Sequence, residues 1–82
     1  MNKIVFDKES SLEWKTRNVW DSKFLAEKFA ATYKEKYPEA YMSLEEGYVM
    51  DPQTGEDIWT WAVVISFSSL ADEALFILNE VQ

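Results

Sequence analysis

The chain has 82 residues, a formal net charge of −7, and neither cysteine nor histidine. This length leaves no room for a second domain. The lack of cysteine excludes disulfides, thiolate metal sites and a cysteine nucleophile. Hydrophobic residues make up 48% of the chain, and four Trp, four Tyr and five Phe supply large burial per residue. We therefore expect one compact domain over residues 1–82.

The sequence offers no membrane or export segment. The apolar run near the N-terminus is only Ile4, Val5 and Phe6, which is far too short for the apolar core of a signal peptide. The longest apolar run, residues 61–65, is too short to span a bilayer. Small secreted domains usually depend on disulfides, which this chain lacks. These features predict a cytoplasmic protein that does not enter a membrane.

The negative charge is concentrated in one segment. Residues 35–57 carry seven carboxylates and a single lysine, Lys36. Such a segment is repelled by nucleic acid and by anionic membranes, so charge would guide the chain to a basic partner. The simpler interpretation is that the acidity keeps a small protein in solution.

The first elements are expected within residues 3–20. Residues 3–6 form a predicted short strand. Leu12, Trp14 and Thr16 alternate with charged residues, which indicates a second strand with one buried face, and residues 7–11 would be the hairpin loop. The alternative is a short helix opened by Ser-Ser-Leu-Glu at residues 10–13, which is a capping-box pattern.

An amphipathic helix follows. Asp21 suits its N-cap, and Trp20 with Leu25 would form a hydrophobic staple. Pro38 ends it, because the residue before proline avoids helical geometry. The predicted packed stripe recurs every four residues: Leu25, Phe29, Tyr33 and Tyr37.

Two strands, residues 40–50 and 57–68, are predicted next. Gly47 would mark a bulge in the first, and the turn formers of residues 51–56 join the two. The second strand has a bulky apolar row and a smaller mixed row, so both of its faces can be covered and it should be central. The bulky row is Trp59, Trp61, Val63, Ile65 and Phe67.

Ser69 looks like the cap of a last helix, with Asp72 three residues on. Leu75 and Phe76 lie outside its main apolar stripe, so the helix needs burial on two sides, and the second side would belong to another molecule. The main stripe is Leu70, Ala74, Ile77, Leu78 and Val81. The predicted fold is α+β: an antiparallel sheet of three or four strands with two helices on one face, in the order β-(β)-α-β-β-α.

Most catalytic chemistry is excluded by residue type. Without histidine and cysteine, the commonest general base and the best nucleophile are missing. Gly47 and Gly55 are the two glycines, so phosphate-cradling glycine loops are absent. The carboxylates of residues 51–57 do not have the spacing of a calcium-binding loop. We expect no enzyme, no metal and no cofactor.

Aromatic and acidic residues share the predicted 40–68 hairpin. Aromatic faces together with carboxylates attract Arg, Lys and other cations. The alternative is that Trp59 and Trp61 are core residues, because one face of the sheet must be buried. The candidate partner-binding carboxylates are Glu45, Glu46, Asp51, Glu56 and Asp57, and the candidate aromatic contacts are Tyr41, Tyr48, Trp59 and Trp61.

Three functions are compatible with these features. The first is an acidic protein-binding module, an inhibitor or adaptor that engages a basic protein surface and mimics nucleic acid if that surface normally holds it. The second is a structural or accessory homo-oligomer, such as a homodimer, that associates through Leu75 and Phe76 of the last helix. The third is a small-ligand or carbohydrate-binding domain that stacks its ligand on Trp59 or Trp61.

In size, acidity and missing catalytic residues, the chain is similar to the general run of small phage-encoded proteins that antagonise host or defence machinery. The likeness is one of class, without a shared motif, and it favours the first function.

Overall fold

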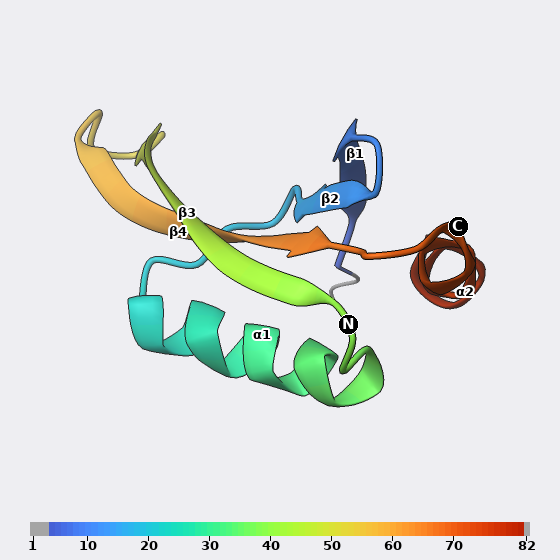
Figure 1. Cartoon of the computed structure of the whole chain (residues 1–82). Helices are drawn as coiled ribbons and strands as arrows, with labels where there is room; N and C mark the ends of the chain where they lie inside the picture. The colour runs from blue at the N-terminus through green and yellow to red at the C-terminus, as the bar shows by residue number, and fades with distance from the viewer. Residues whose placement is uncertain (1–3, 82) are drawn as a thin grey trace.

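A computed structural model describes residues 4–81 and contains a four-stranded antiparallel sheet and two helices. The elements are β1 (Phe6–Ser10), β2 (Glu13–Thr16), α1 (Lys23–Lys36), β3 (Tyr41–Met50), β4 (Asp57–Ser66) and α2 (Leu70–Glu80). The strands lie in the order β1-β2-β4-β3 (Figure 1). This confirms the α+β class, the element order and the central position of the second long strand.

The N-terminal hairpin confirms the strand prediction for residues 13–16 and excludes the helix. Trp14 pairs with Lys8 of β1 and with Ile65 of β4. The predicted loop was wrong, because residues 7–10 belong to β1. Leu12 lies in the turn with φ 65°, so it is not part of the strand whose pattern it extends. Lys3, at the start of the predicted first strand, lies outside the described residues.

The helix α1 begins one residue later than predicted. Ser22, not Asp21, is the N-cap, and its hydroxyl accepts a hydrogen bond from the Leu25 amide at 3.4 Å. The helix ends before Pro38, as expected. The predicted staple does not form: Leu25 is 46% exposed, and Trp20 packs instead on Phe29 with ring centroids 4.7 Å apart. Trp20 packs on Phe29 rather than on Leu25 because the aromatic ring offers a larger contact area.

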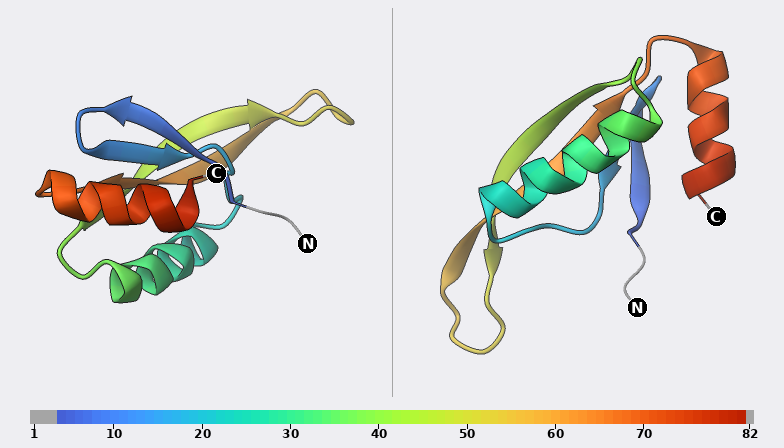
Figure 2. Two further views of the ribbon diagram at one scale, coloured as in Figure 1. Left: turned by 90° about the vertical axis from the view of Figure 1, so that its right-hand side faces the viewer. Right: turned by 90° about the horizontal axis from the view of Figure 1, so that it is seen from below.

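Both helices pack against the sheet and contribute to one aromatic core. The helix α1 lies along β3 and β4, and α2 lies beside the β1–β2 hairpin at the end of β4 (Figures 1 and 2). Phe76 of α2 is fully buried, and its ring lies 5.0 Å from those of Phe6 and Phe67. The ring centroids of Trp14 and Tyr37 lie 5.7 and 5.6 Å from it.

The orientation of α2 corrects the sequence prediction. Its cap is confirmed, since the Ser69 hydroxyl accepts a hydrogen bond from the Asp72 amide at 3.2 Å. The buried residues, however, are Glu73 and Phe76 rather than the predicted stripe. Phe76 is therefore unavailable for self-association. Five residues predicted to be packed or to lie beside that stripe are exposed instead: Leu70, Ala74, Leu75, Ile77 and Leu78.

The β3–β4 hairpin extends beyond the body of the molecule (Figure 2). Its ten residue pairs run without a register shift from Tyr41–Ser66 to Met50–Asp57. The predicted bulge at Gly47 is therefore absent, and Gly47 pairs regularly with Thr60. Gly55 takes φ 75° in the connecting turn, a conformation that side chains disfavour. Among residues 4–81, no helix is long and apolar enough to cross a membrane.

Candidate functional site

Three aromatic residues gather on the distal half of the hairpin. Tyr48 and Trp59 are cross-strand partners, so their side chains share one face of the sheet. Their ring centroids lie 4.4 Å apart at 79°, and Trp61 lies 6.3 Å from Trp59. Tyr48 is 65% exposed and Trp59 38% exposed. The core interpretation therefore fails for Trp59, which lies beyond the cover of the helices.

Trp61 anchors this cluster to the body. Its backbone exchanges two hydrogen bonds with Trp20, at 2.9 and 2.8 Å. Its side chain is half-buried, and its indole Nε1 is buried without a hydrogen-bond partner within residues 4–81. Trp61 is thus mostly a packing residue, and the accessible part of the cluster is Tyr48 and Trp59.

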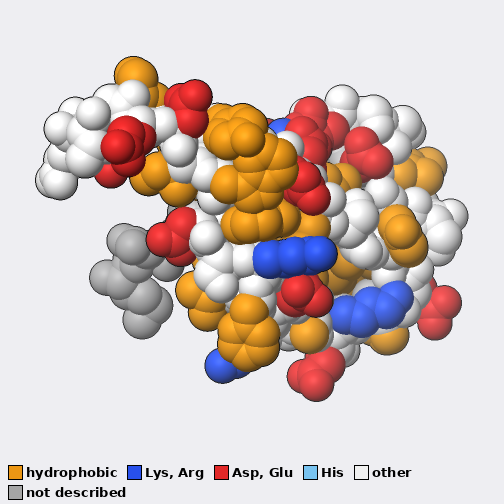
Figure 3. Space-filling model, turned by 90° about the vertical axis from the view of Figure 1, so that its left-hand side faces the viewer, with side chains coloured by type: hydrophobic (Ala, Val, Ile, Leu, Met, Phe, Trp, Pro, Cys, Tyr) orange, Lys and Arg blue, Asp and Glu red, His pale blue; other side chains and the backbone are white. Residues whose placement is uncertain are grey.

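Two of the five candidate carboxylates flank the aromatic cluster. Glu46 pairs with Trp61, and Asp57 pairs with Met50, so the alternation of the strands puts both carboxylates on the aromatic face. Both are exposed, and neither forms an ion pair within the described part of the chain. We define the aromatic–acidic surface as Glu46, Tyr48, Asp57, Trp59 and the exposed part of Trp61. Figure 3 looks onto this end of the molecule and shows hydrophobic side chains between acidic ones, with basic side chains lower in the view.

The other candidate carboxylates have different surroundings. Glu45 lies on the opposite face and accepts a hydrogen bond from Lys15 at 2.9 Å, which raises the pKa of that lysine. Asp51 shapes the turn, because its side chain accepts a hydrogen bond from the Gln53 amide at 2.8 Å. Glu56 is exposed near the tip of the hairpin. The sequence placed five carboxylates in one segment, and the fold separates them between two faces and a turn.

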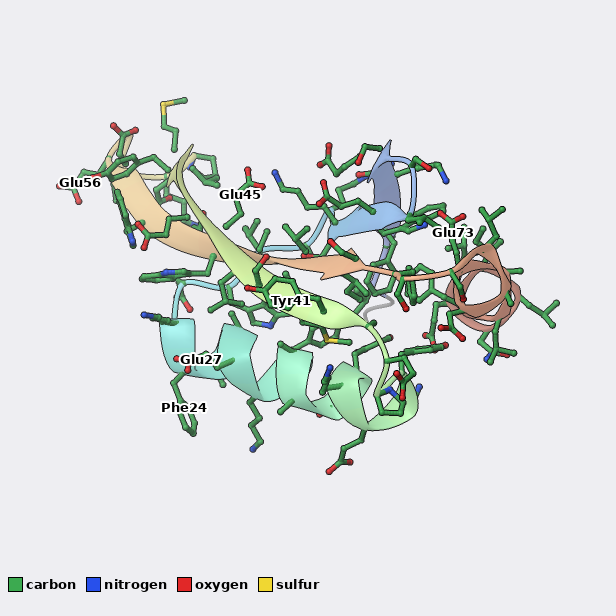
Figure 4. All side chains as sticks on the ribbon, in the orientation of Figure 1. Phe24, Glu27, Tyr41, Glu45, Glu56 and Glu73 are labelled. Atoms are coloured by element: carbon green, nitrogen blue, oxygen red, sulfur yellow. The ribbon has the colours of Figure 1, made fainter. Side chains whose placement is uncertain are left out.

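Tyr41 does not join the other aromatic residues. It pairs with Ser66 at the opposite end of β3 and belongs to the other face of the sheet. Its side chain is 70% exposed. Figure 4 shows it over the middle of the molecule, away from the tip of the hairpin. Strand alternation accounts for this separation, because Tyr41 and Tyr48 are an odd number of residues apart and so lie on opposite faces.

A metal site is not found in the described residues. No group of three or more Asp and Glu within residues 4–81 is arranged to hold a metal ion. In the acidic turn region, Glu56 and Asp57 are exposed and Asp51 is half-buried.

One surface feature escaped the sequence reasoning. A groove of about 380 Å³ runs between α1 and β3. It is lined by Glu27, Ala30, Ala31, Lys34, Tyr41, Met42, Ser43 and Leu44. The available signal was the pair of alanines, Ala30 and Ala31, on the predicted helix. The groove itself is seen only once α1 packs beside β3.

Comparison of the chain with protein-family models, curated proteins and solved structures found no match.

Proposed function

We propose that the chain is a non-enzymatic, acidic protein-binding module that uses its aromatic–acidic surface to engage a basic protein as an inhibitor or adaptor. The observation that carries this proposal is the exposed Tyr48–Trp59 pair between the carboxylates Glu46 and Asp57. Residues 45–57 hold five carboxylates and neither Lys nor Arg, so no internal cation from this segment competes for them.

This arrangement suits an arginine or lysine side chain. A cation over an aromatic face gains about 0.5–2 kcal/mol, more when water is excluded. A nearby carboxylate adds a charge-assisted hydrogen bond, and arginine can make two such bonds at once. Tyr and Trp are also enriched among residues whose truncation weakens interfaces most. Tyr48 and Trp59 would supply buried area, and the carboxylates would select a basic partner.

The shape of the hairpin supports insertion into a partner. The hairpin extends past α1 (Figures 1 and 2). Both of its faces carry exposed apolar side chains near the tip. Val49 and Ile58 are 45% and 38% exposed on the face opposite Tyr48 and Trp59. A projecting element with two apolar faces and an acidic rim can enter a basic cleft. If that cleft normally holds DNA or RNA, the carboxylates would replace phosphates.

Two further parts of the proposal concern the cellular location of the protein and its role as an inhibitor. The lack of cysteine supports a cytoplasmic location, where thiols and disulfides are not used for stability. The similarity in class to small phage-encoded antagonists supports an inhibitory role. Cell fractionation and competition with DNA for the captured partner test these two parts.

The test compares three forms of the tagged protein in pull-downs from a lysate. The first is the natural chain. The second neutralises hairpin carboxylates with Glu46→Gln, Glu56→Gln and Asp57→Asn. The third is a control that neutralises the same number of exposed carboxylates elsewhere, with Asp21→Asn, Glu35→Gln and Glu39→Gln.

We expect the natural chain and the control to retain the same basic protein at low salt and to release it at high salt. The hairpin variant should lose it, because screening and neutralisation act on the same contacts. Equal retention by all three forms would contradict the role of these carboxylates. Trp59→Ala should weaken capture already at low salt, since the contribution of this ring is not purely electrostatic.

Self-association through α2 is the second candidate. Six apolar residues form a continuous exposed arc on the helix, and leucines this exposed are unusual in a monomer when they are contiguous. The arc consists of Leu70, Ala71, Ala74, Leu75, Ile77 and Leu78. Leu70 and Leu78 are 72% and 75% exposed. Sedimentation equilibrium of the natural chain and of Leu75→Glu/Leu78→Glu tests it: a dimer that the double variant dissociates supports it, and a monomeric natural chain rules it out.

A further inference from the structure

The two edges of the sheet differ in a way that points to a docking function. The β1 edge is five residues long, and its pairing is irregular between Lys8 and Ser10. Short strands, irregular pairing and lysines are features that protect an edge from further strand pairing. The β3 edge is ten residues long and regular, and it contains neither proline nor lysine. It therefore lacks these protections.

The backbone direction along β3 follows from the hydrogen bonds of β4. Trp61 exchanges its backbone hydrogen bonds with Trp20, on the side of β4 that faces β2. In an antiparallel ladder the direction alternates, so Thr60 and Ala62 bond toward β3. Their partners, Gly47 and Glu45, bond back toward β4. The N–H and C=O groups of Met42, Leu44 and Glu46 consequently point to the free edge.

The groove defined above lies beside this free edge. Ala30 and Ala31 of α1 are small, and they leave space opposite Met42 and Leu44, which are only half-buried. An added strand would therefore have two kinds of contact: main-chain pairing with β3 and an apolar pocket for alternate side chains. This combination is how extended peptides bind at sheet edges.

A second copy of the chain is a poor occupant of this edge. In antiparallel self-pairing, an edge-facing residue of one copy lies opposite an edge-facing residue of the other, so the registers centred on β3 place Glu45 opposite Glu45 or Glu46 opposite Glu46. Like charges directly opposite each other destabilise a strand pair. Glu27 and Lys34 both line the groove, but the Lys34 ammonium donates a hydrogen bond to the Ala40 carbonyl oxygen. Glu27, which is labelled in Figure 4, has no ion-pair partner within residues 4–81, and neither has Glu46. The carboxylates of Glu27 and Glu46 therefore favour a basic segment as the occupant of this edge.

We propose that the free edge of β3 binds an extended basic segment of a partner protein by strand addition. The segment pairs with the main chain of Met42, Leu44 and Glu46. It directs an apolar side chain into the groove and a Lys or Arg side chain toward Glu27 and Glu46. This proposal rests on the proposed function for the basic character of the partner, and it adds the partner's conformation and the surface that holds it.

The probe is a blocked peptide, acetyl-Thr-Val-Thr-Val-Thr-Arg-Thr-Arg-amide, together with versions in which Glu replaces Arg or the valines are N-methylated. Binding is followed by NMR titration of the full chain, with amide exchange measured at residues 42, 44 and 46. The decisive variant is Glu46→Pro, which removes an edge-facing N–H without removing a bond to β4. Its matched control is Glu46→Ala, which loses the same carboxylate and keeps the N–H.

A second pair of variants keeps the test independent of the proline. Ala31→Trp fills the groove, and Thr32→Trp places the same ring on the neighbouring exposed position of α1, outside the groove lining. We expect the peptide to slow exchange at Met42 and Leu44. Glu46→Pro should weaken binding at least tenfold relative to Glu46→Ala, and Ala31→Trp should do so relative to Thr32→Trp. The N-methylated and Glu-containing peptides should bind at least tenfold more weakly.

Three results would overturn the edge proposal. One is the absence of slowed exchange at residues 42 and 44 at the highest peptide concentration. Another is binding that Trp59→Ala weakens while Glu46→Pro and Ala31→Trp leave it unchanged, relative to their controls. In that case the aromatic–acidic surface holds the peptide and the proposed function survives alone. The third is a dimer that Glu46→Pro dissociates, because a second copy then occupies the edge.

Discussion

Trp14 donates its indole N–H to the carboxylate of Glu73 at 2.9 Å, and this bond joins β2 to α2 across 59 positions of sequence. The Glu73 side chain is 7% exposed, and Lys8 reaches the same oxygen at 2.7 Å. A carboxylate is rarely buried unless it is paired in this way. The inner face of α2 therefore carries a paired acid, whereas the sequence predicted an apolar stripe there.

The Glu73 pairing predicts acid sensitivity. Hydrogen bonds from Lys8 and Trp14 lower the pKa of Glu73 below its ordinary value of 4.5. The stabilisation is therefore complete above about pH 4.5 and is lost as pH falls through the lowered pKa of the folded state. Glu73→Gln should lower the urea midpoint at pH 7 and flatten its decline in acid. The exposed control Glu35→Gln should decline as the natural chain does, and parallel curves for all three proteins would contradict the prediction.

A second glutamate of α2 predicts alkaline sensitivity. Glu80 accepts hydrogen bonds from the hydroxyls of Tyr33 and Tyr37 at 2.9 and 2.8 Å. Burial, followed by the bond to Glu80, raises the pKa of Tyr33 well above its ordinary value of 10.0. This stabilisation is complete below pH 10 and is lost as pH rises through the raised pKa of the folded state.

Absorbance at 295 nm during a titration with base measures this effect. We expect a late phenolate step that accompanies unfolding in the natural chain and that loses part of its amplitude in Tyr33→Phe. Urea unfolding at pH 7 should also show a lower midpoint for Tyr33→Phe, because Glu80 loses one donor. A titration that Tyr33→Phe leaves unchanged would refute the assignment.

The opposite sides of α2 predict unequal effects of truncation. Phe76 is fully buried among aromatic rings, and Phe76→Ala should cost about 3–5 kcal/mol of unfolding free energy. Leu78 is 75% exposed, and Leu78→Ala should change it by no more than about 0.5 kcal/mol in the monomer. Urea denaturation at low protein concentration makes the comparison. Equal losses would show that α2 packs in another orientation.

The exposure of Trp59 predicts how the tryptophan fluorescence responds to acrylamide. Trp59 is 38% exposed, whereas Trp14 is 7% exposed. Trp59→Phe should therefore remove the most readily quenched part of the emission. If quenching is as strong in Trp59→Phe as in the natural chain, the aromatic–acidic surface is covered and the proposed contact fails. A quenchable Trp59 also leaves open a stacking site for a carbohydrate, which titration with sugars would detect.

Local patterns determined much of the fold. The alternation around Trp14 indicated β2, and the clusters of turn formers and Pro38 bounded the later elements. These signals are reliable because they reflect backbone restrictions and side-chain periods that act within a few residues. The sequence alone also locates most of the net negative charge in residues 35–57. Its lack of cysteine and histidine excludes reactions that need those side chains.

Tertiary packing decided which faces are buried and which surfaces can bind. The apolar stripe of α2 indicated its burial, yet Glu73 and Phe76 face the core, because Trp14, Lys8 and the aromatic rings offer them partners. The register of the β3–β4 hairpin decided which residues of β4 lie beside Glu46 and Tyr48, and it paired them with Trp61 and Trp59. A periodic pattern shows that one side of a helix or strand tends to be buried. The residues that bury it are distant in sequence, and only the folded chain brings them together.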